Sequence, residues 1–406
     1  MHIPSPAASE PILERDQQAV SVWQRLAPER WPLPLDRLPQ GTALVGGAVR
    51  DAWLNRLQQE PDLDLVVPSD ALGLTRRLAK DLDGTVVVLD EKRDMARLVL
   101  RGWTVDIARQ DGLTLEEDLQ RRDYRLNAIA MTLQPPLRLV DPTGGLTDLS
   151  KGRLSAVRES NLTDDPLRLL RGLRLMAEIP LQADATTTGW IHRHRHRLAE
   201  AAPERILAEL QKLVAGPHAE QALRLLIDLE LVSPWGAEKD LLCREDAALL
   251  TQEERSQALP LARLSRLISA EGLNRLRASR NLQERCRRLR HWRQTLQKNH
   301  DALSEQDQLE LHLDLGTDLP ALIVQLDASL QADWLQRWRD PTDPLFHPKA
   351  PVDGTTLQQE LNLAPGPQLG ALLRHLLMES AFGRIKGSED ALVEAQRWCV
   401  QDRCAL

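Results

Sequence analysis

The pattern of apolar residues changes near residue 150, and this change constrains the fold more than any other feature of the chain. Between residues 19 and 150, short apolar runs such as DLDLVVP, GTVVVLD and TVDIAR have the length and composition of β-strands. From residue 164 onward, apolar residues recur at helical spacing, as in PERILAELQKLVAG, and strand patterns nearly vanish. We therefore expect an α+β protein, with a small N-terminal α/β domain followed by an all-helical remainder.

Composition and breaks rich in proline or glycine divide the chain further. The first 18 residues are rich in Pro, Ser and Glu, and we expect a loose arm there. Within the α/β domain, the stretches ALGLTRRLAKDLD and RRDYRLNAIAM are expected to be helical. The expected boundaries are 1–18 for the arm, 19–150 for an α/β head, 151–215 for a helical neck, 216–338 for a helical body and 339–406 for a helical tail.

Charge and cysteine content exclude several classes of protein. The formal net charge of −7 argues against a uniformly basic nucleic-acid binder but permits a local basic surface. The N-terminus has no signal-like pattern, and no run reaches the ~18 apolar residues of a membrane span, so we expect a cytoplasmic protein. Four cysteines without CxxC spacing are expected to be structural thiols: Cys243, Cys286, Cys399 and Cys404.

Two aspartates one residue apart, in the apolar run DLDLVV, are the strongest chemical signal. On a strand, Asp62 and Asp64 project from the same face, while Leu63 and Leu65 point into the core. Carboxylates this close repel each other, and burial raises the pKa of at least one, unless a cation neutralises them. Mg²⁺ prefers a few carboxylates together with substrate phosphates. The alternative is an exposed edge strand with surface acids.

The neighbouring residues favour the metal site. Gly46 and Gly47 lie between an apolar strand and a helix-like stretch, where the backbone can approach a phosphate closely. Arg50 adds a charged donor, and Asp106 is a third carboxylate in a later strand-like segment. Together these parts indicate nucleotidyl transfer, in which metal ions activate a hydroxyl nucleophile and stabilise the departing pyrophosphate.

Four stretches, in order, resemble the motifs of the class II tRNA nucleotidyltransferases, which include CCA-adding enzymes and bacterial poly(A) polymerases. These stretches are LVGGAVRDAWL…DLDLVV, EEDLQRRDYRLNAIAM, DDPLRLLRGLRL and PERILAELQKLV. The resemblance is strong over about residues 40–215 and continues weakly to the C-terminus. It implies a polymerase-beta-like nucleotidyltransferase head with a two-metal Mg²⁺ site. It also implies template-independent addition of C, A or both, from CTP and ATP, to the 3′ end of tRNA.

The resemblance further implies roles for individual residues. Asp165 and Arg168 are three residues apart on an expected helix and share a face, so together they would read the edge of the incoming base. Arg171, one turn further, would support that pair or the triphosphate. A capped helix with an internal salt bridge is the alternative for this segment, and a surface ion pair is the alternative for residues 121–123. By the same match, Asp62 and Asp64 would hold the metal ions beside Asp106, Asp123 would bind the ribose, and Gly46, Gly47, Arg50, Arg122 and Asn127 would contact phosphates.

Departures from the family pattern bear on the choice of nucleotide. The usual Glu-Asp is Asp164-Asp165 here, and the usual Phe-Thr is Tyr124-Arg125, but neither removes a proposed catalytic group. Many CCA-adding members carry an extended flexible loop before RRD, whereas DIARQDGLTLEEDLQRRD is short, which argues against terminal A addition. CC addition, A addition and poly(A) synthesis remain alternatives. An RNA-binding scaffold without activity is a non-enzymatic alternative.

Two basic stretches lie in the helical part. HRHRHR sets His192 and His196 one helical turn apart, but no third ligand is apparent, so an exposed helix face is favoured over a metal site. RASRNLQERCRRLRHWRQ is expected to form one helix that contacts the tRNA backbone, unless its arginines pair with local glutamates. The arginines concerned are Arg285, Arg287, Arg288, Arg290 and Arg293. The sequence makes no prediction about oligomeric state.

Overall fold

The computed structural model describes residues 12–236, 249–298 and 303–401. The chain divides into two compact units. One contains the residues up to Ala202 together with Pro217–Leu231, and the other contains Pro203–Gly216 and the residues from Val232 onward. All strands of the described residues lie in the first unit, and the second is helical, which confirms the predicted α+β class with an N-terminal α/β head.

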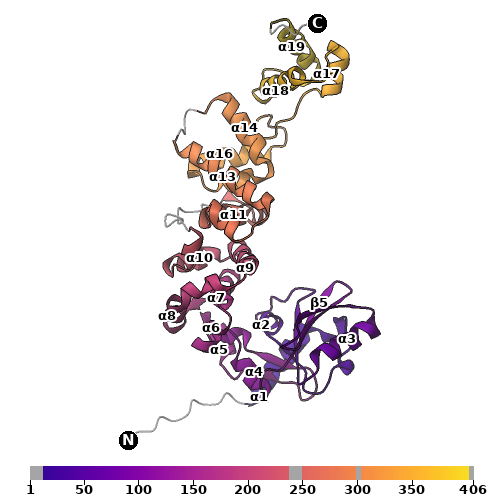
Figure 1. The fold of residues 1–406 in the computed structure, drawn as a ribbon, viewed down its shortest axis with the longest axis vertical. Coiled ribbons are helices and arrows are strands. Elements are labelled where there is room, and N and C mark those ends of the chain that lie inside the picture. Colours follow the sequence, from indigo (N-terminus) through magenta and orange to yellow (C-terminus); the bar gives the residue numbers. More distant parts are fainter. Residues whose placement is uncertain (1–11, 237–248, 299–302, 402–406) are drawn as a thin grey trace. The chain divides into compact units, whose positions relative to one another are not determined.

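A seven-stranded sheet forms the centre of the head (Figure 1). Its strand order is β3-β4-β5-β2-β1-β6-β7, and every neighbouring pair is antiparallel except β2 and β5, which run parallel. The strands predicted from DLDLVV, GTVVVLD and TVDIAR are confirmed as β2, β3 and β5. The bounds are β1 Ala43–Val45, β2 Leu63–Val67, β3 Thr85–Asp90, β4 Met95–Leu100, β5 Trp103–Arg109, β6 Ala130–Thr132 and β7 Leu139–Val140.

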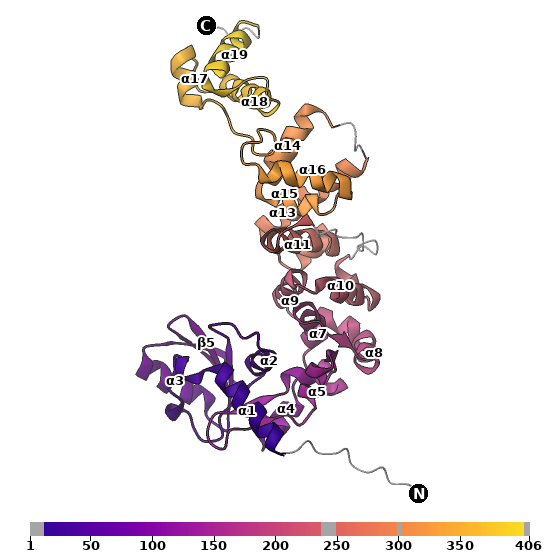
Figure 2. The same ribbon diagram turned by 180° about the vertical axis from the view of Figure 1, so that it is seen from behind.

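Helices cover this sheet and continue into the neck. Helix α3 packs against β3, β4 and β5, and Figure 1 shows it beside the sheet. Figure 2, seen from behind, shows α1 on the near side of the head, where it packs against α2 and β7. Beyond the sheet, α7 packs on α10, and β8 pairs with β9 in a small parallel sheet. The helices are α1 Ile12–Leu26, α2 Gly47–Trp53, α3 Ala71–Leu82, α4 Leu115–Gln120, α5 Gly145–Ser150, α6 Glu159–Asp164, α7 Leu167–Glu178, α8 Ala185–His194 and α10 Ala219–Asp228; β8 is Arg153–Leu154 and β9 is Gln182–Ala183.

The second unit is built from amphipathic helices. Helix α11 packs on α9, α13 and α15, and a capping box of Thr251 and Glu254 begins it. Near the C-terminus, α17, α18 and α19 enclose a separate apolar cluster around Leu357, Leu372 and Leu376. The helices are α9 Pro203–Ala215, α11 Gln252–Leu267, α12 Ala270–Arg275, α13 Arg280–Lys298, α14 Glu305–Leu315, α15 Leu319–Ile323, α16 Ala328–Arg339, α17 Gly354–Leu361, α18 Pro367–Ala381 and α19 Gly387–Gln401.

Two expectations about local structure before residue 150 are wrong. Residues 12–18, predicted to belong to a loose arm, form the first part of α1, whose residues Ala19, Val22 and Leu26 are buried. The stretch 121–131 is not a helix but a turn, the 3₁₀ helix η3 (Arg125–Asn127) and the start of β6. Its backbone instead bonds to distant segments, because Arg125 N–H donates to Ser155 O (2.9 Å) and β6 pairs with β1. Tertiary pairing overrides the local pattern here.

Candidate active site

Three acidic residues and one arginine lie side by side across neighbouring strands of the head. Asp64 on β2 is paired in register with Asp106 on the parallel strand β5. Arg97 on β4 stands opposite Asp106 from the other side. Asp62 lies two residues before Asp64, immediately ahead of β2, so the two share a face as predicted. The strand pairing thus gathers the three predicted carboxylates at one place.

Asp64 is the carboxyl whose environment is most unusual. Its side chain is half-buried, whereas Asp62 is exposed. Burial raises the pKa of Asp64 to about 6; the negative charges of Asp106 and Asp62 add to the rise, and the positive charge of Arg122 opposes it. The charged form of Asp64 is therefore disfavoured in the protein alone, and a nearby cation would stabilise it.

Asp106 already has a cationic partner. Arg97 Nε and Nη2 donate to its two oxygens at 2.7 and 3.0 Å. These hydrogen bonds raise the pKa of the Arg97 guanidinium, and the charges of Asp62 and Asp64 add to the rise. Within the described ranges, no group of three or more acidic, histidine or cysteine side chains is arranged to hold a metal ion. The protein therefore offers Asp62 and Asp64 as an acidic pair, with Asp106 engaged beside them.

The glycine pair brings the backbone close to this acidic pair. Gly46 follows β1 with φ of +76°, a conformation that side chains disfavour. A Cβ added there would lie 3.5 Å from Asp64 Oδ2 and 3.7 Å from Arg122 Nη1. Gly47 is the first residue of α2. The structure thus brings together Gly46, Asp64 and Arg122, which the sequence separates by up to 76 positions.

The two polar side chains predicted to contact phosphates next to these residues bond to each other. Arg50 is buried on α2, and its Nη1 donates to Asn127 Oδ1 at 2.7 Å. Its Nε and Nη2 donate to the carboxylate of Asp51, each at 3.0 Å. The pairing fixes both side chains before any substrate is present. Arg50 and Asn127 are therefore held together at this edge of the head, with the donors of Arg50 occupied within the protein.

The turn after α4 carries Arg122 and Asp123, and each is anchored by an ion pair. Arg122 Nη2 lies 3.1 Å from Asp118 Oδ2 on α4. Asp123 Oδ2 accepts from Arg171 Nη1 at 3.1 Å, which links the turn to α7 in the neck. Burial acts to raise the pKa of Asp123, but the charges of Arg171 and Arg168 outweigh it and hold that pKa below its usual value. Asp123 is therefore a charged acceptor in a buried position.

The segment DDPLR differs from its predicted conformation. Asp165 is not helical: its φ of −135° and ψ of 101° place it between α6 and α7. The following residue, Pro166, explains this, because a residue before proline is driven out of the α region. Arg168 lies on α7, and its Nη1 donates to the backbone oxygens of Arg121 (3.0 Å) and Asn161 (2.9 Å). The prediction that Asp165 and Arg168 share a helix face is therefore wrong, although both lie at the start of α7.

Sequence reasoning missed three residues that organise this region. Arg97 neutralises Asp106, and only its place in the strand pattern could have drawn attention to it. Asn161 is buried, and its Nδ2 donates to the backbone oxygens of Gln120 (2.8 Å) and Arg122 (2.7 Å). Tyr124 is fully buried and donates its hydroxyl to Arg168 O at 2.8 Å. Together, Asn161 and Tyr124 hold the turn against α6 and α7.

The five body arginines predicted to contact RNA all have partners within the protein. The partners are acidic side chains for three of them and uncharged oxygens for the other two. Contact with tRNA by these residues therefore remains a prediction that competes with intramolecular bonds. The pairs are Arg285 with Asp318 (2.6 Å), Arg287 and Arg288 with Glu284 (2.7 Å each), Arg290 with Ser265 O (2.7 Å), and Arg293 with Gln325 Oε1 (3.5 Å).

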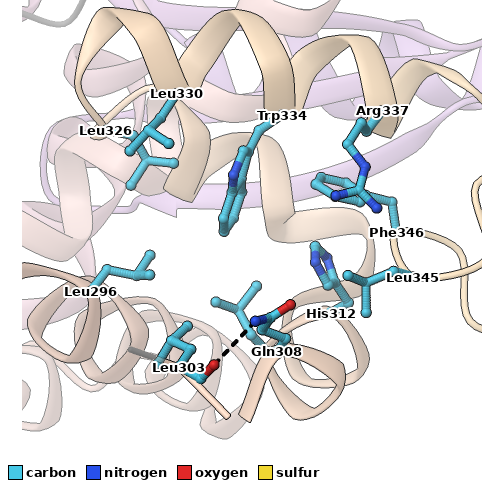
Figure 3. Close-up of a pocket in the computed structure, with 11 residues that line it drawn as sticks. Leu296, Leu303, Gln308, His312, Leu326, Leu330, Trp334, Arg337, Leu345 and Phe346 are labelled. Atoms are coloured by element: carbon cyan, nitrogen blue, oxygen red, sulfur yellow. Dashed lines mark hydrogen bonds between the residues drawn. The ribbon is translucent and has the colours of Figure 1, made fainter. Parts of the chain in front are cut away.

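The body also holds a cavity of about 240 Å³ between α13, α14 and α16. Figure 3 shows Trp334 pointing into it, with Gln308 and His312 facing it from α14. The buried Nδ1 of His312 has no hydrogen-bond partner among the described residues. Burial lowers the pKa of His312 to about 4, and the charge of Arg337 adds to the effect, so the ring is neutral at neutral pH.

The histidines and cysteines for which the sequence predicts no catalytic role lie outside the candidate active site. His192 belongs to α8, which ends at His194, whereas His196 lies in the following 3₁₀ helix. Cys286 and Cys399 are free thiols, and Cys243 and Cys404 lie outside the described residues. Among the described helices, none combines the length and apolar character needed to cross a bilayer.

Two family sequence models match the chain. Residues 42–155 match the poly A polymerase head domain, and residues 181–235 match a probable RNA and SrmB-binding site of polymerase A. A CC-adding tRNA nucleotidyltransferase of Synechocystis is 32% identical over 397 residues, covering 90% of this chain and 95% of that protein. An A-adding tRNA nucleotidyltransferase of Deinococcus radiodurans is 37% identical over 204 residues, covering 49% of this chain and 46% of that protein.

Solved structures share the fold at low identity. A CCA-adding enzyme in complex with CTP matches with a TM-score of 0.70 at 20% identity, covering 96% of this chain and 99% of that one. The Thermotoga maritima CCA-adding enzyme complexed with tRNA gives a TM-score of 0.67 at 21% identity, covering 96% of each chain. The head fold and its family match define this protein as a nucleotidyltransferase.

The match to the Synechocystis relative extends over nearly the whole length of that protein, and it narrows the class of nucleotidyltransferase. The chain belongs to the family of tRNA nucleotidyltransferases. The family predicted from the four sequence motifs is therefore confirmed, and so is the prediction of an enzyme that adds C, A or both. Since these relatives are enzymes, the alternative of an inactive scaffold has no support.

Proposed function

We propose that this enzyme adds C residues, but not the terminal A, to the 3′ end of tRNA. The observation that carries the proposal is the connection between β5 and α4, which consists of residues 110–114 alone. By the family resemblance, full CCA addition is associated with an extended flexible loop in this place. A connection of five residues leaves little chain to reshape a base-binding site between the two nucleotides.

The connection is also tied down along its length. Asp111 N–H donates to Asp118 Oδ1 at 3.0 Å. Leu113 N–H donates to Glu117 Oε2 at 2.7 Å. Arg121 forms an ion pair with Asp111. Each of these bonds has to break before the segment can move, so we infer that it stays in one conformation and serves a single nucleotide. The name of the Synechocystis relative, a CC-adding enzyme, agrees with this proposal.

We further propose that Asp62 and Asp64 hold Mg²⁺. The donor set fits, because neither residue has an ion-pair partner among the described residues and the pKa of Asp64 is raised to about 6, mainly by burial. Two carboxylates and the oxygens of a triphosphate form a coordination shell that Mg²⁺ accepts. When bound, the metal supplies activation of the 3′-hydroxyl and neutralises charge on the departing pyrophosphate.

The protein's own residues bind and orient the nucleotide in this proposal. Arg50, Asn127 and Arg122 exchange their present partners for triphosphate oxygens, while the backbone at Gly46 allows close approach. Asp123, held charged by Arg171, accepts from a ribose hydroxyl. The 3′-hydroxyl oxygen of tRNA then forms a bond to the α-phosphorus of CTP as the bond to pyrophosphate breaks. Asp165 and Arg168 select the base once Arg168 has released the carbonyls it now holds.

The test is incubation of the purified enzyme with Mg²⁺, labelled CTP or ATP, and tRNA transcripts ending at the discriminator base or after CC. We expect two CMP residues on the first transcript and no AMP on either. AMP incorporation after CC would contradict the proposal in favour of CCA addition or A addition. Long A tracts on unrelated RNA would contradict it in favour of poly(A) synthesis.

Variants of single aspartates test the metal ligands. Asp62→Ala is expected to abolish incorporation while leaving the urea unfolding curve unchanged. Asp36→Ala, an exposed aspartate of the same unit, is the matched control and is expected to keep wild-type activity. A wild-type rate in Asp62→Ala would refute the metal assignment.

A further inference from the structure

One of the three acids in the head is neutralised by a side chain of the sheet itself. Arg97 and Asp106 are directly opposed in the antiparallel pair of β4 and β5, so the strand register brings them together. Both oxygens of Asp106 accept from the Arg97 guanidinium, at 2.7 and 3.0 Å. The Asp106 side chain is 21% exposed and that of Arg97 is 42% exposed. The pair lies beside Asp64, on the same sheet face.

This pairing changes what the site can offer a cation. A carboxylate whose two oxygens accept from one guanidinium has one lone pair of each oxygen occupied and its charge balanced by the arginine. The positive charge of Arg97 also repels any second cation placed beside Asp64. Asp106 therefore lies beside the other two acidic residues but is not available as a metal ligand. Only the carboxylates of Asp62 and Asp64 remain to bind a cation.

We propose that Arg97 is a positioning residue that withholds Asp106 from the metal site, so that the enzyme binds a divalent cation firmly only together with a nucleoside triphosphate. Two carboxylates alone bind Mg²⁺ weakly, and phosphate oxygens complete the shell. Metal and nucleotide then enter as one unit. The inference rests on the proposed function in one respect, namely that Asp62 and Asp64 hold the metal.

The experiment measures Mn²⁺ binding to the full chain by electron paramagnetic resonance, without RNA, in the presence and absence of CTP. Wild type is expected to bind Mn²⁺ weakly alone and much more tightly with CTP. In Arg97→Gln, which removes the charge and frees Asp106, we expect affinity without nucleotide to rise at least about tenfold. The gain from adding CTP should shrink accordingly.

Three further variants separate this role from a merely structural one. Arg97→Lys keeps the charge and is expected to remain near wild type in Mn²⁺ affinity. Asp106→Asn leaves the Arg97 charge without its partner and is expected to weaken Mn²⁺ binding. The double variant Arg97→Gln/Asp106→Asn should lose the tenfold gain, because the freed ligand is then absent. Circular dichroism and urea unfolding verify that each variant is folded.

An unchanged Mn²⁺ affinity in Arg97→Gln without nucleotide would overturn the inference, and so would a gain that persists in the double variant. The readout needs neither RNA nor turnover. The enzyme could fail to add C to tRNA while its variants still show the expected changes in Mn²⁺ affinity. That result would count against the proposed function alone and would support the role of Arg97. The two failures are therefore distinguishable.

Discussion

Asp123 and Arg171 form an ion pair that joins the head to the neck, with Nη1 of the arginine 3.1 Å from Oδ2 of the aspartate. Asp123 lies in the turn after α4, and Arg171 lies on α7. Burial acts to raise the pKa of Asp123, yet Arg171 and Arg168 hold it below its usual value. The residue proposed to bind ribose is thus fixed by the helix that carries the proposed base-selecting arginine.

Breaking this pair should destabilise the protein. We expect Arg171→Met to lower the free energy of unfolding by about 3 kcal/mol, because a buried carboxylate loses its cation. The KM for CTP should rise as Asp123 loses its position. Urea unfolding and CMP incorporation measure the two effects. Arg193→Met is the control: that side chain is 64% exposed in its pair with Glu159, so the loss should be much smaller. Equal losses in the two variants would contradict the role of the buried pair.

Asn161 is expected to position the turn that carries Arg122. Asn161→Leu leaves the backbone oxygens of Gln120 and Arg122 without their donor, which should lower the free energy of unfolding by about 2–4 kcal/mol. The KM for CTP should rise with it. Thr163→Ala on the same helix is the control, because its hydroxyl bonds locally to Ser160 O, and its loss should be small. A wild-type KM in a folded Asn161→Leu variant would argue against positioning.

Gly172 gives Tyr124 the space that it occupies. A Cβ at residue 172 would lie 2.2 Å from the Tyr124 hydroxyl oxygen, so we expect Gly172→Ala to lower the free energy of unfolding by about 1–3 kcal/mol. Gly189→Ala on α8 is the matched control: nothing lies within 4 Å of its added Cβ, and it should stabilise by about 1 kcal/mol. Thermal or urea unfolding distinguishes them. A neutral Gly172→Ala would show that Tyr124 can move.

The sequence predicted the parts of this site better than their connections. Asp62 and Asp64 followed from strand alternation alone, because the period of two is a local property. Arg97 did not, because its partner Asp106 is set by which strand pairs with β4, and a single sequence does not specify that pairing. The stretch 121–131 was predicted as a helix because its apolar spacing is helical, but its backbone bonds to Ser155 and β1 instead.

In the neck and body, too, local features of the sequence are predictable and contacts between distant elements are not. Pro166 could have corrected the helix predicted through Asp165, since the conformational effect of proline on the preceding residue is local. In the body, pairing of Arg287 and Arg288 with Glu284 at helical spacing was foreseeable as the alternative to RNA contact. The partner of Arg285, Asp318, lies 33 residues away and required the fold. Contacts within one turn are predictable; those between elements are not.

Asp64 should make the metal-free protein less stable at neutral pH. Its folded pKa of about 6, raised mainly by burial, exceeds the ordinary aspartate value of 3.8, so the folded state binds the proton more tightly. Stability from this group is present below pH 4 and is lost as pH rises through about 6. With EDTA, we expect Asp64→Asn to be about 1–3 kcal/mol more stable than wild type at pH 7.5, although we expect it to be inactive.

This advantage of Asp64→Asn should shrink as pH falls toward 4, where the wild-type carboxyl is neutral in both states. Urea unfolding across that range measures it, with the exposed Asp36→Asn as control. A difference from wild type that stays constant from pH 7.5 to 4.5 would contradict the raised pKa.

His312 should give the body the opposite pH dependence. Its ring centroid lies 4.2 Å from that of Phe346, and burial lowers its pKa from 6.5 to about 4. The unfolded chain therefore binds the proton more readily, so stability is full above about pH 6.5 and falls as pH drops toward 4. The loss approaches about 3 kcal/mol at the lower limit.

His312→Phe removes the titrating group from an apolar, aromatic site. Relative to wild type, this variant should gain stability steadily between pH 6.5 and 4.5 in urea unfolding, whereas a flat difference would mean that the ring takes up its proton without unfolding.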